Sequence, residues 1–169
     1  MGIERMWAGW RSTYVREAAG EPAAGDAEGC VMCRLAAAPD DDEAFVVARG
    51  AHAFVVLNAY PYTSGHLMVV PDRHEGSLEL LSPAESAEVM GLTQWATAAL
   101  KRAYRPDGIN VGMNLGTAAG AGVPGHLHVH VLPRWSADTN FMTAVAETRV
   151  IPESLDETLE RLRAAWDGD

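Results

Sequence analysis

The run His126-Leu127-His128-Val129-His130-Val131 alternates imidazole and apolar side chains along the chain. This period of two is typical of a β-strand, because successive side chains of a strand point to opposite faces of its sheet. Leu127, Val129 and Val131 would then enter a hydrophobic core, and the imidazoles would lie about 6.6 Å apart on the other face. The run therefore predicts a sheet with one covered face and one face that borders a cleft.

Other segments supply further strands for such a sheet. Three runs rich in Val and Phe, Ala44–Arg49, His52–Asn58 and His66–Pro71, are separated by turn-forming residues and predict an antiparallel meander. Two further strands are predicted over Ile109–Leu115 and Leu127–Pro133.

Capping boxes predict the start of two helices. Ser82 and Glu85 begin a long helix, which apolar residues at helical spacing extend to about Tyr104. Ser154 and Glu157 begin a helix near the C-terminus. The fold class that follows is α+β, an antiparallel sheet with one long helix packed on it and a C-terminal helix.

Length and charge limit the organisation and the partners of the chain. A chain of 169 residues can form one domain with a real core, and we expect an N-terminal arm and loop over residues 1–29 and a single domain over residues 30–169. The net charge of -10 argues against a nucleic-acid partner, although a locally positive pocket could still bind a small anion. No apolar run approaches the roughly 18 residues that span a bilayer, and no signal peptide is recognised, so we expect no membrane partner and a cytoplasmic location.

The histidine run has a catalytic and a metal-binding interpretation. Alternating histidines can chelate a metal, so a pure metal site is one alternative. Neutral imidazole is also a nitrogen nucleophile near pH 7, because its unperturbed pKa is about 6.5. The glycine-rich segment 116–122 precedes the run, and its backbone amides could stabilise charge on phosphate oxygens. The combination favours phosphoryl transfer.

The two cysteines of the chain, Cys30 and Cys33, form a Cys-x-x-Cys motif at the start of a predicted short helix over Cys30–Ala38. The pair could be a redox centre, two buried thiols or half of a zinc site. A zinc site needs about two more ligands. By residue type the candidates are His52, His66, His74 and a member of the histidine run.

These motifs together resemble those of the histidine triad (HIT) superfamily, whose signature is three alternating histidines followed by apolar residues, as in His126–Pro133. Other segments are similar to a bacterial and archaeal branch described as diadenosine tetraphosphate phosphorylase-like. They follow in the same order along nearly the whole chain: Met6–Arg11, the Cys-x-x-Cys motif, Asn58–Tyr62, Gly65–Pro71, Asn114–Gly116, Pro133–Trp135, Asp138–Phe141 and Val150–Ser154.

The resemblance implies a HIT-like fold, a homodimer, and a nucleotide phosphorylase or hydrolase. Such an enzyme would act on diadenosine polyphosphate-type nucleotides through a covalent nucleotidyl-histidine intermediate. The family nucleophile matches His128, and His130 matches the histidine that contacts the phosphate or supports the nucleophile.

The resemblance also implies how the substrate is bound. Asn58 matches the position that holds the ribose hydroxyls, and Asn114 matches a polar residue near the phosphates. His66 matches a histidine on the active-site side of a neighbouring strand. We expect backbone amides near Gly120 and Gly122 to stabilise the phosphate charge.

In zinc-bearing relatives the metal ligands match Cys30, Cys33, His74 and His126. Two thiolates and two neutral imidazoles form a closed tetrahedral set, so the expected Zn²⁺ is structural. The triad is then divided between two tasks, with His126 on the metal and the other two histidines in the chemistry.

One segment departs from the family pattern. Many hydrolases of the family carry Gly-Gln-Ser/Thr just before the triad, whereas this chain has Ala121-Gly122-Val123-Pro124-Gly125. The second nucleophile therefore stays open among water, phosphate and another acceptor. The alternative functions are a nucleoside phosphoramidate hydrolase, a nucleotidyltransferase with another acceptor, and a non-catalytic nucleotide-binding module.

Overall fold

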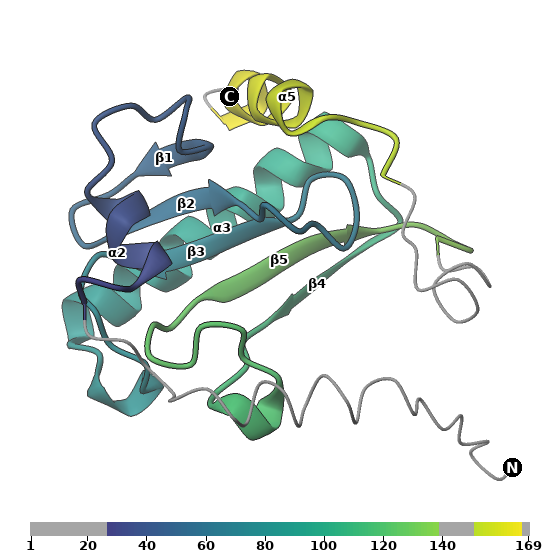
Figure 1. Ribbon diagram of the computed structural model, residues 1–169. Coiled ribbons are helices and arrows are strands. Elements are labelled where there is room, and N and C mark those ends of the chain that lie inside the picture. The colour runs from purple at the N-terminus through teal and green to yellow at the C-terminus, as the bar shows by residue number, and fades with distance from the viewer. Residues whose placement is uncertain (1–26, 139–150, 167–169) are drawn as a thin grey trace, which may run out of the picture.

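The computed structural model describes residues 27–138 and 151–166, and it contains the five-stranded antiparallel sheet of Figure 1. Each strand pairs antiparallel with its neighbours. The order across the sheet is β1 (Val46–Arg49), β2 (Ala53–Leu57), β3 (Leu67–Pro71), β5 (Val129–Arg134) and β4 (Gly108–Gly112). The predicted meander of the first three strands is thus confirmed.

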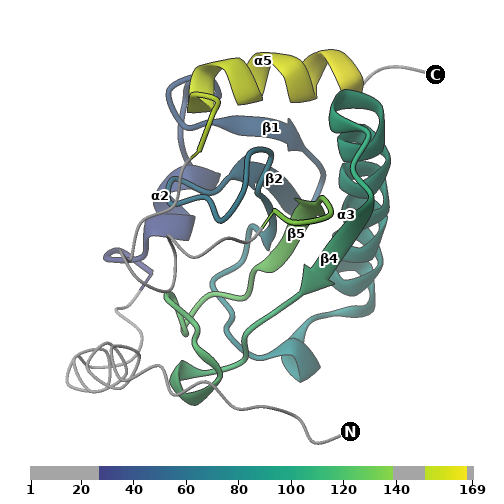
Figure 2. The same ribbon diagram turned by 90° about the vertical axis from the view of Figure 1, so that its right-hand side faces the viewer.

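Helices lie on both faces of this sheet. Figure 2 shows the long α3 (Pro83–Tyr104) on one side and the short α2 (Val31–Ala36) on the other. α5 (Leu155–Trp166) packs against α3 and β1. Two 3₁₀ turns, η1 (Leu78–Leu80) and η2 (Thr117–Ala119), complete the described elements. The predicted α+β class is confirmed.

The long helix begins and ends where the sequence predicts. The Ser82 hydroxyl accepts a hydrogen bond from the Glu85 backbone N–H at 3.2 Å, and the Glu85 carboxylate accepts one from the Ser82 N–H at 2.7 Å. This capping box satisfies two amides that have no partner inside the helix. Arg105 adopts a left-handed conformation with φ 47°, which ends the helix after Tyr104.

The sheet separates two apolar clusters, and the histidine segment contributes to both of its faces. Val129 and Val131 belong to the larger cluster under α3 and α5. Met68 pairs with His130 and belongs to the smaller cluster on the face that α2 covers. The predicted division into a core face and an imidazole face is therefore confirmed at these positions.

The strand that carries the triad is shorter at its start than predicted. β5 begins at Val129, so His126 and His128 precede it. The Leu127 backbone N–H instead donates to the Glu75 carbonyl at 2.7 Å, which draws the segment away from the edge of β3. Gly76 lies so close that an added Cβ would be 2.4 Å from the Pro124 carbonyl oxygen. A side chain at position 76 would force these two segments apart.

The other predicted strands are also longer than the observed ones, those of β2 and β3 by only two residues and one residue. β1 begins at Val46 and not at Ala44, because the chain turns through Phe45, whose φ is 54°. β4 ends at Gly112 and not at Leu115. Gly116, with φ 79°, then leads the chain into η2.

Some predictions concern residues outside the described ranges. Most of the predicted arm over 1–29 lies there, as do parts of the segments Asp138–Phe141 and Val150–Ser154, so the proposed domain limits stay a prediction. Among the helices of residues 27–138 and 151–166, none is long and apolar enough to cross a membrane.

Candidate active site and metal-binding cluster

A cavity of about 530 Å³ lies where α2, the end of β2 and the glycine-rich loop meet the triad. His128 and His130 line it, together with Asn58, Gly120 and Gly122. Five predicted site residues from two distant parts of the sequence are therefore brought to one cavity.

The opposite part of the cavity wall is apolar. Val31, Met32 and Leu35 of α2 line it, with Phe45 from the turn before β1. Such a wall can bury a flat hydrophobic ring while polar groups elsewhere fix its orientation. The cavity thus combines an apolar region with an imidazole-rich region.

The hydrogen bond of His128 fixes which of its nitrogens can react. His128 is buried, and its Nδ1 lies 2.9 Å from the backbone carbonyl oxygen of His126. A carbonyl oxygen only accepts hydrogen bonds, so Nδ1 carries the proton in this contact. The lone pair of the neutral ring is then on Nε2. This is the tautomer in which Nε2 can act as a nucleophile.

A second hydrogen-bond chain fixes His130. The Tyr62 backbone N–H donates to Nδ1 of His66 at 3.1 Å, so the proton of neutral His66 is on Nε2. His66 Nε2 lies 2.9 Å from Nδ1 of His130 and donates to it. The proton of His130 is then on Nε2, where it can be donated to a ligand.

Burial keeps His130 neutral. Burial, and secondarily the nearby His128, lower the pKa of His130 from 6.5 to about 4. The two rings are 4.9 Å apart and nearly perpendicular. His130 therefore offers an N–H donor at neutral pH, next to the His128 ring whose neutral tautomer has its lone pair on Nε2.

Two residues predicted to contact substrate do not line the cavity. His66 is 1% exposed, and it is not among the described residues that line the cavity. Asn114 is also outside that lining, and its side-chain amide donates to the Gly120 carbonyl at 3.3 Å. Their positions suit support of His130 and of the glycine-rich loop.

Tyr62 is a site residue that the sequence analysis did not single out. Its half-exposed side chain lines the cavity, and its ring centroid lies 4.7 Å from that of His66 and 6.1 Å from that of His130. The motif Asn58–Tyr62 contained it, but spacing alone does not place a turn residue against a ring on another strand.

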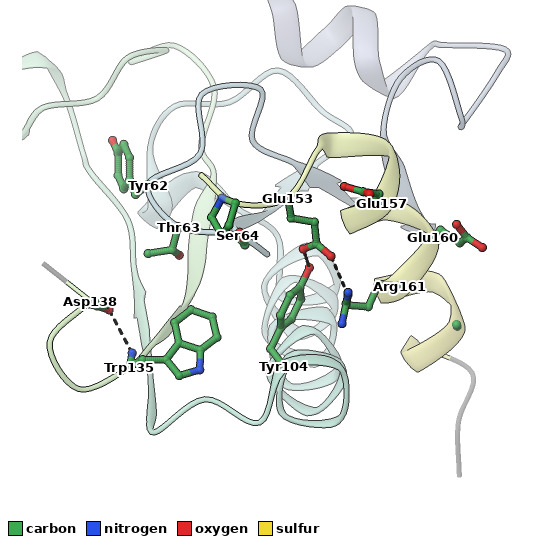
Figure 3. A pocket seen from close by; sticks show the side chains of 12 residues that line it. Tyr62, Thr63, Ser64, Tyr104, Trp135, Asp138, Glu153, Glu157, Glu160 and Arg161 are labelled. Carbon is green, nitrogen blue, oxygen red and sulfur yellow. Dashed lines mark hydrogen bonds and ion pairs between the residues drawn. The ribbon is translucent and has the colours of Figure 1, made fainter. Parts of the chain in front are cut away.

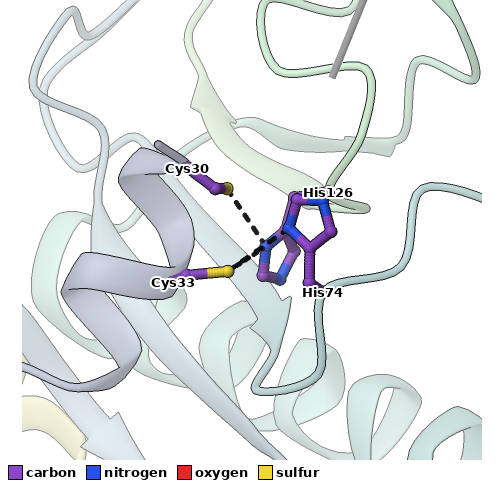
Figure 4. Close-up of side chains that lie close together, drawn as sticks. All are labelled: Cys30, Cys33, His74 and His126. Carbon is purple, nitrogen blue, oxygen red and sulfur yellow. Dashed lines mark hydrogen bonds between the residues drawn. The ribbon is translucent and has the colours of Figure 1, made fainter. Parts of the chain in front are cut away.

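The predicted metal ligands converge on the other side of the triad. Figure 4 shows Cys30 and Cys33 of the α2 end facing His74 and His126. The four possible ligand atoms all lie within 4.8 Å of one another. His52 and His66, which residue type alone left open as ligands, are outside this cluster.

The spacing of these atoms fits a tetrahedral metal ion. Cys30 Sγ lies 3.4 Å from His126 Nδ1, and Cys33 Sγ lies 3.3 Å from His74 Nδ1. Sulfur and nitrogen ligands at about 2.3 and 2.0 Å from a tetrahedral zinc would be separated by about 3.5 Å. His126 Nε2 lies 2.8 Å from the Pro71 carbonyl oxygen and donates to it, which leaves Nδ1 free for a metal.

A second cavity, of about 870 Å³, lies between α5 and the loop that joins β2 to β3 (Figure 3). Tyr62 lines both cavities, but no histidine is among the described residues of the second one. Glu153, Glu157 and Glu160 border it. These carboxylates would repel a phosphate, so the smaller cavity is the better candidate for phosphoryl chemistry.

Comparison with known proteins gives relatives for the whole chain. The chain is 43% identical over 166 residues to the "AP-4-A phosphorylase" of Mycobacterium tuberculosis. The aligned region covers 97% of this chain and 85% of that protein. A crystal structure of a Zn-bound histidine triad family protein from Mycobacterium smegmatis superposes with a TM-score of 0.67 at 28% identity, over 83% of this chain and 95% of that one.

A third relative is similar in fold. The Hit-like protein of Bartonella henselae has a TM-score of 0.68 at 23% identity, over 84% of this chain and 98% of that one. The HIT domain family matches residues 40–137, more than half of the chain and the part that contains the cavity histidines. The chain belongs to the HIT domain family.

Proposed function

We propose that the chain is an enzyme, a nucleotide phosphorylase or hydrolase that acts on diadenosine polyphosphate-type nucleotides. The observation that carries this proposal is the contact of His128 Nδ1 with the His126 carbonyl oxygen, which leaves Nε2 as an unprotonated nucleophile in the cavity. A protein that only binds nucleotides would not need an imidazole held in this tautomer.

The reaction has two displacement steps. His128 Nε2 attacks the α-phosphorus and forms a P–N bond, while the P–O bond to the departing polyphosphate breaks and its electron pair leaves on oxygen. Phosphate or water then attacks the same phosphorus, and the P–N bond breaks to restore the imidazole. The products are a nucleoside diphosphate with phosphate as acceptor, or a monophosphate with water.

Other cavity residues have roles that follow from their chemistry. His130 Nε2–H and backbone amides near Gly120 and Gly122 would donate to the phosphate oxygens and stabilise their charge. Asn58 would hold the ribose hydroxyls, and the apolar wall of α2 would pack against the base.

The relative from Mycobacterium tuberculosis favours phosphate as the second nucleophile, since its name is "AP-4-A phosphorylase". The loop before the triad has no Gln or Ser side chain over residues 121–125 to contact the scissile phosphate or the leaving group, in contrast to the pattern of many hydrolases of the family. The alternatives are a nucleoside phosphoramidate hydrolase and a nucleotidyltransferase with another acceptor.

Replacing the nucleophile should abolish turnover and preserve the fold. We expect His128→Ala to reduce the cleavage of diadenosine tetraphosphate by several orders of magnitude, because no other group can form the P–N bond. Steady-state kinetics with far-UV circular dichroism checks this. Wild-type turnover by a folded His128→Ala protein would refute the mechanism. The products that the wild-type enzyme forms with and without phosphate identify the acceptor.

We also propose that His66 is a positioning residue that acts through His130. His66→Phe removes the hydrogen bond to His130 Nδ1, so the Nε2–H tautomer of His130 is no longer enforced. We expect kcat to fall about 10- to 100-fold with little change in KM, and His66→Gln to restore part of it. ¹⁵N NMR of the imidazoles should show a mixed His130 tautomer in His66→Phe. An unchanged tautomer in that variant would exclude this role.

For the metal cluster we propose structural Zn²⁺. Two thiolates and two imidazoles suit zinc, and the Mycobacterium smegmatis relative is described as Zn-bound. When bound, the ion would fix the α2 end against the turn after β3 and would take no part in the chemistry, because the four side chains close its coordination.

Elemental analysis should find one zinc per chain in the wild-type protein. We expect His74→Ala to lose the metal and to lower Tm by about 5–15 °C, since metal binding stabilises the folded state. The control is His52→Ala, which removes an exposed histidine outside the cluster. Equal metal content and Tm in the two variants would contradict the assignment.

We further propose a homodimer that forms through the edge strand β4. Within the described residues β4 pairs only with β5, and Val111 on it is 51% exposed. Unpaired backbone groups and an exposed apolar side chain at a sheet edge favour pairing with a second copy.

A cytoplasmic location suits a protein that needs reduced thiols, and cell fractionation can test it.

Val111→Asp should convert the dimer to a monomer, because two carboxylates would face each other across a two-fold interface. Analytical ultracentrifugation measures the change. Leu80→Asp is the matched control, since Leu80 is similarly exposed but lies away from β4. A wild-type protein that sediments as a monomer would refute the proposed dimer.

A further inference from the structure

We propose that Cys30 and Cys33 form a reversible oxidation site that controls the nucleotide cavity. A peroxide would join the two thiolates in a disulfide, the metal would leave, and the cavity would lose its affinity for nucleotide. This inference rests on the nucleotide function proposed above.

One connection between the two sites runs through His126. Its ring contributes Nδ1 to the metal cluster, while its backbone carbonyl oxygen accepts the hydrogen bond of the nucleophile His128 at 2.9 Å. The ring is completely buried and is held on its other side by the Pro71 carbonyl. A displacement of this ring therefore moves the group that sets the tautomer of His128.

The second connection is α2 itself. Its cysteines belong to the metal cluster, and its residues Val31, Met32 and Leu35 form the apolar wall of the cavity. α2 has six residues, far fewer than the roughly 12 that an isolated helix needs for even marginal stability. Its position must therefore come from contacts with the rest of the chain, which are the packing of Met32 and Leu35 in the smaller apolar cluster and the contacts at its two ends.

The two ends of α2 are held in different ways. At the C-terminal end, the Arg49 guanidinium donates to the carbonyl oxygens of Leu35 and Ala36 at 3.1 and 2.8 Å. At the N-terminal end, Cys30 has no side-chain capping bond, and its thiol faces the histidines of the cluster. A bound metal would thus fix Cys30 and Cys33 at this end of α2, next to the apolar packing of Met32.

The geometry of the two cysteines permits a disulfide. They are three residues apart at the first turn of α2, where Cβ atoms are about 5–6 Å apart, and a small shift brings them to the usual distance of about 4 Å. Cys33 is partly exposed and Cys30 is buried. The Cys33 sulfur is therefore the one that an oxidant in solution can reach.

The proposed step consumes one hydrogen peroxide. The Cys33 thiolate attacks a peroxide oxygen, the O–O bond breaks, and a sulfenic acid and hydroxide form. The Cys30 thiolate then attacks this sulfur, forms the S–S bond and expels a second hydroxide. The two sulfurs are oxidised by two electrons in total, and the two peroxide oxygens are reduced by two.

Oxidation removes half of the ligand set. A zinc ion held by His74 and His126 alone has two of its four protein ligands, so it would dissociate. The N-terminal end of α2, then held only by its apolar packing, would shift and change the shape of the cavity wall that Val31 and Met32 form. Reduction followed by zinc would rebuild both sites.

The test uses the zinc-loaded full-length protein and AMP as the probe. Hydrogen peroxide is added in steps, released zinc is followed with a chromophoric chelator, and the disulfide is measured by mass spectrometry. We expect zinc release in proportion to disulfide and a Kd for AMP that is weakened at least about 10-fold by calorimetry. Dithiothreitol with zinc should restore the original Kd.

Two controls separate this disulfide from other oxidation. Met32 and Met68 also line the cavity, but a thiol reductant does not reverse methionine sulfoxide. Cys33→His keeps a possible metal ligand and cannot form the disulfide, so peroxide should cause no loss of AMP affinity that dithiothreitol with zinc reverses. If this variant does not hold zinc, the reversal in the wild-type protein still decides the question.

Several results would overturn the inference. They are an unchanged Kd in the zinc-free disulfide form, retention of zinc after oxidation, absence of zinc from the reduced protein, and global unfolding by circular dichroism. Failure of the proposed function looks different, because the reduced, zinc-loaded protein would then not bind AMP at all.

Discussion

The alternating direction of side chains along residues 126–131 is the constraint on which the rest of the structure depends. On one side of this segment Val129 and Val131 pack under α3. This packing fixes the position and the rotation of the segment relative to the sheet. The imidazoles of His128 and His130 then have to project toward the face that α2 covers. A shift in register of one residue would exchange the two sets, bury the imidazoles in the apolar core and expose its valines.

The same segment joins the metal cluster to the chemistry. The ring of His126 belongs to the metal cluster, and the backbone carbonyl oxygen of His126 accepts the hydrogen bond of His128. Two neighbouring sites therefore share one residue. β5 begins only at Val129, and the residues before it take their positions from Glu75 and Pro71 as well as from the sheet. A segment held only at its strand end would leave the nucleophile free to rotate, and the metal cluster removes that freedom.

Local patterns in the sequence predicted most of the fold. The capping box at Ser82 and Glu85 gave the start of α3 correctly, because a cap depends only on residues a few positions apart. The ends of β1 and β4 were predicted wrongly, since a strand ends where its partner ends and not where its own β-propensity ends. Apolar residues such as Ala44 and Leu115 were therefore assigned to strands although no partner strand reaches them.

The site residues differ in how much about them could be predicted from the sequence. Residue types and family motifs selected Cys30 and His128, and Cys30 lies in the metal cluster while His128 lines the cavity. The placement of His66 behind His130, and of Tyr62 beside both rings, depends on contacts between separate strands and a turn. One sequence contains no information on such distances, so the family resemblance placed His66 near the substrate without its hydrogen bond to His130.

The charge of the cavity explains how an acidic chain can accommodate a phosphate. Among the described residues that line it there is no Lys or Arg, and Glu43 is the one carboxylate. Charge on a bound phosphate would therefore be met by neutral donors, the His130 N–H and backbone amides, in a partly buried site where such dipoles act strongly. Burial keeps the pKa of His130 near 4, so this donor does not become a cation at neutral pH. A neutral donor set can stabilise the charge that develops in the transition state and still release an anionic product, whereas a cluster of arginines would retain it.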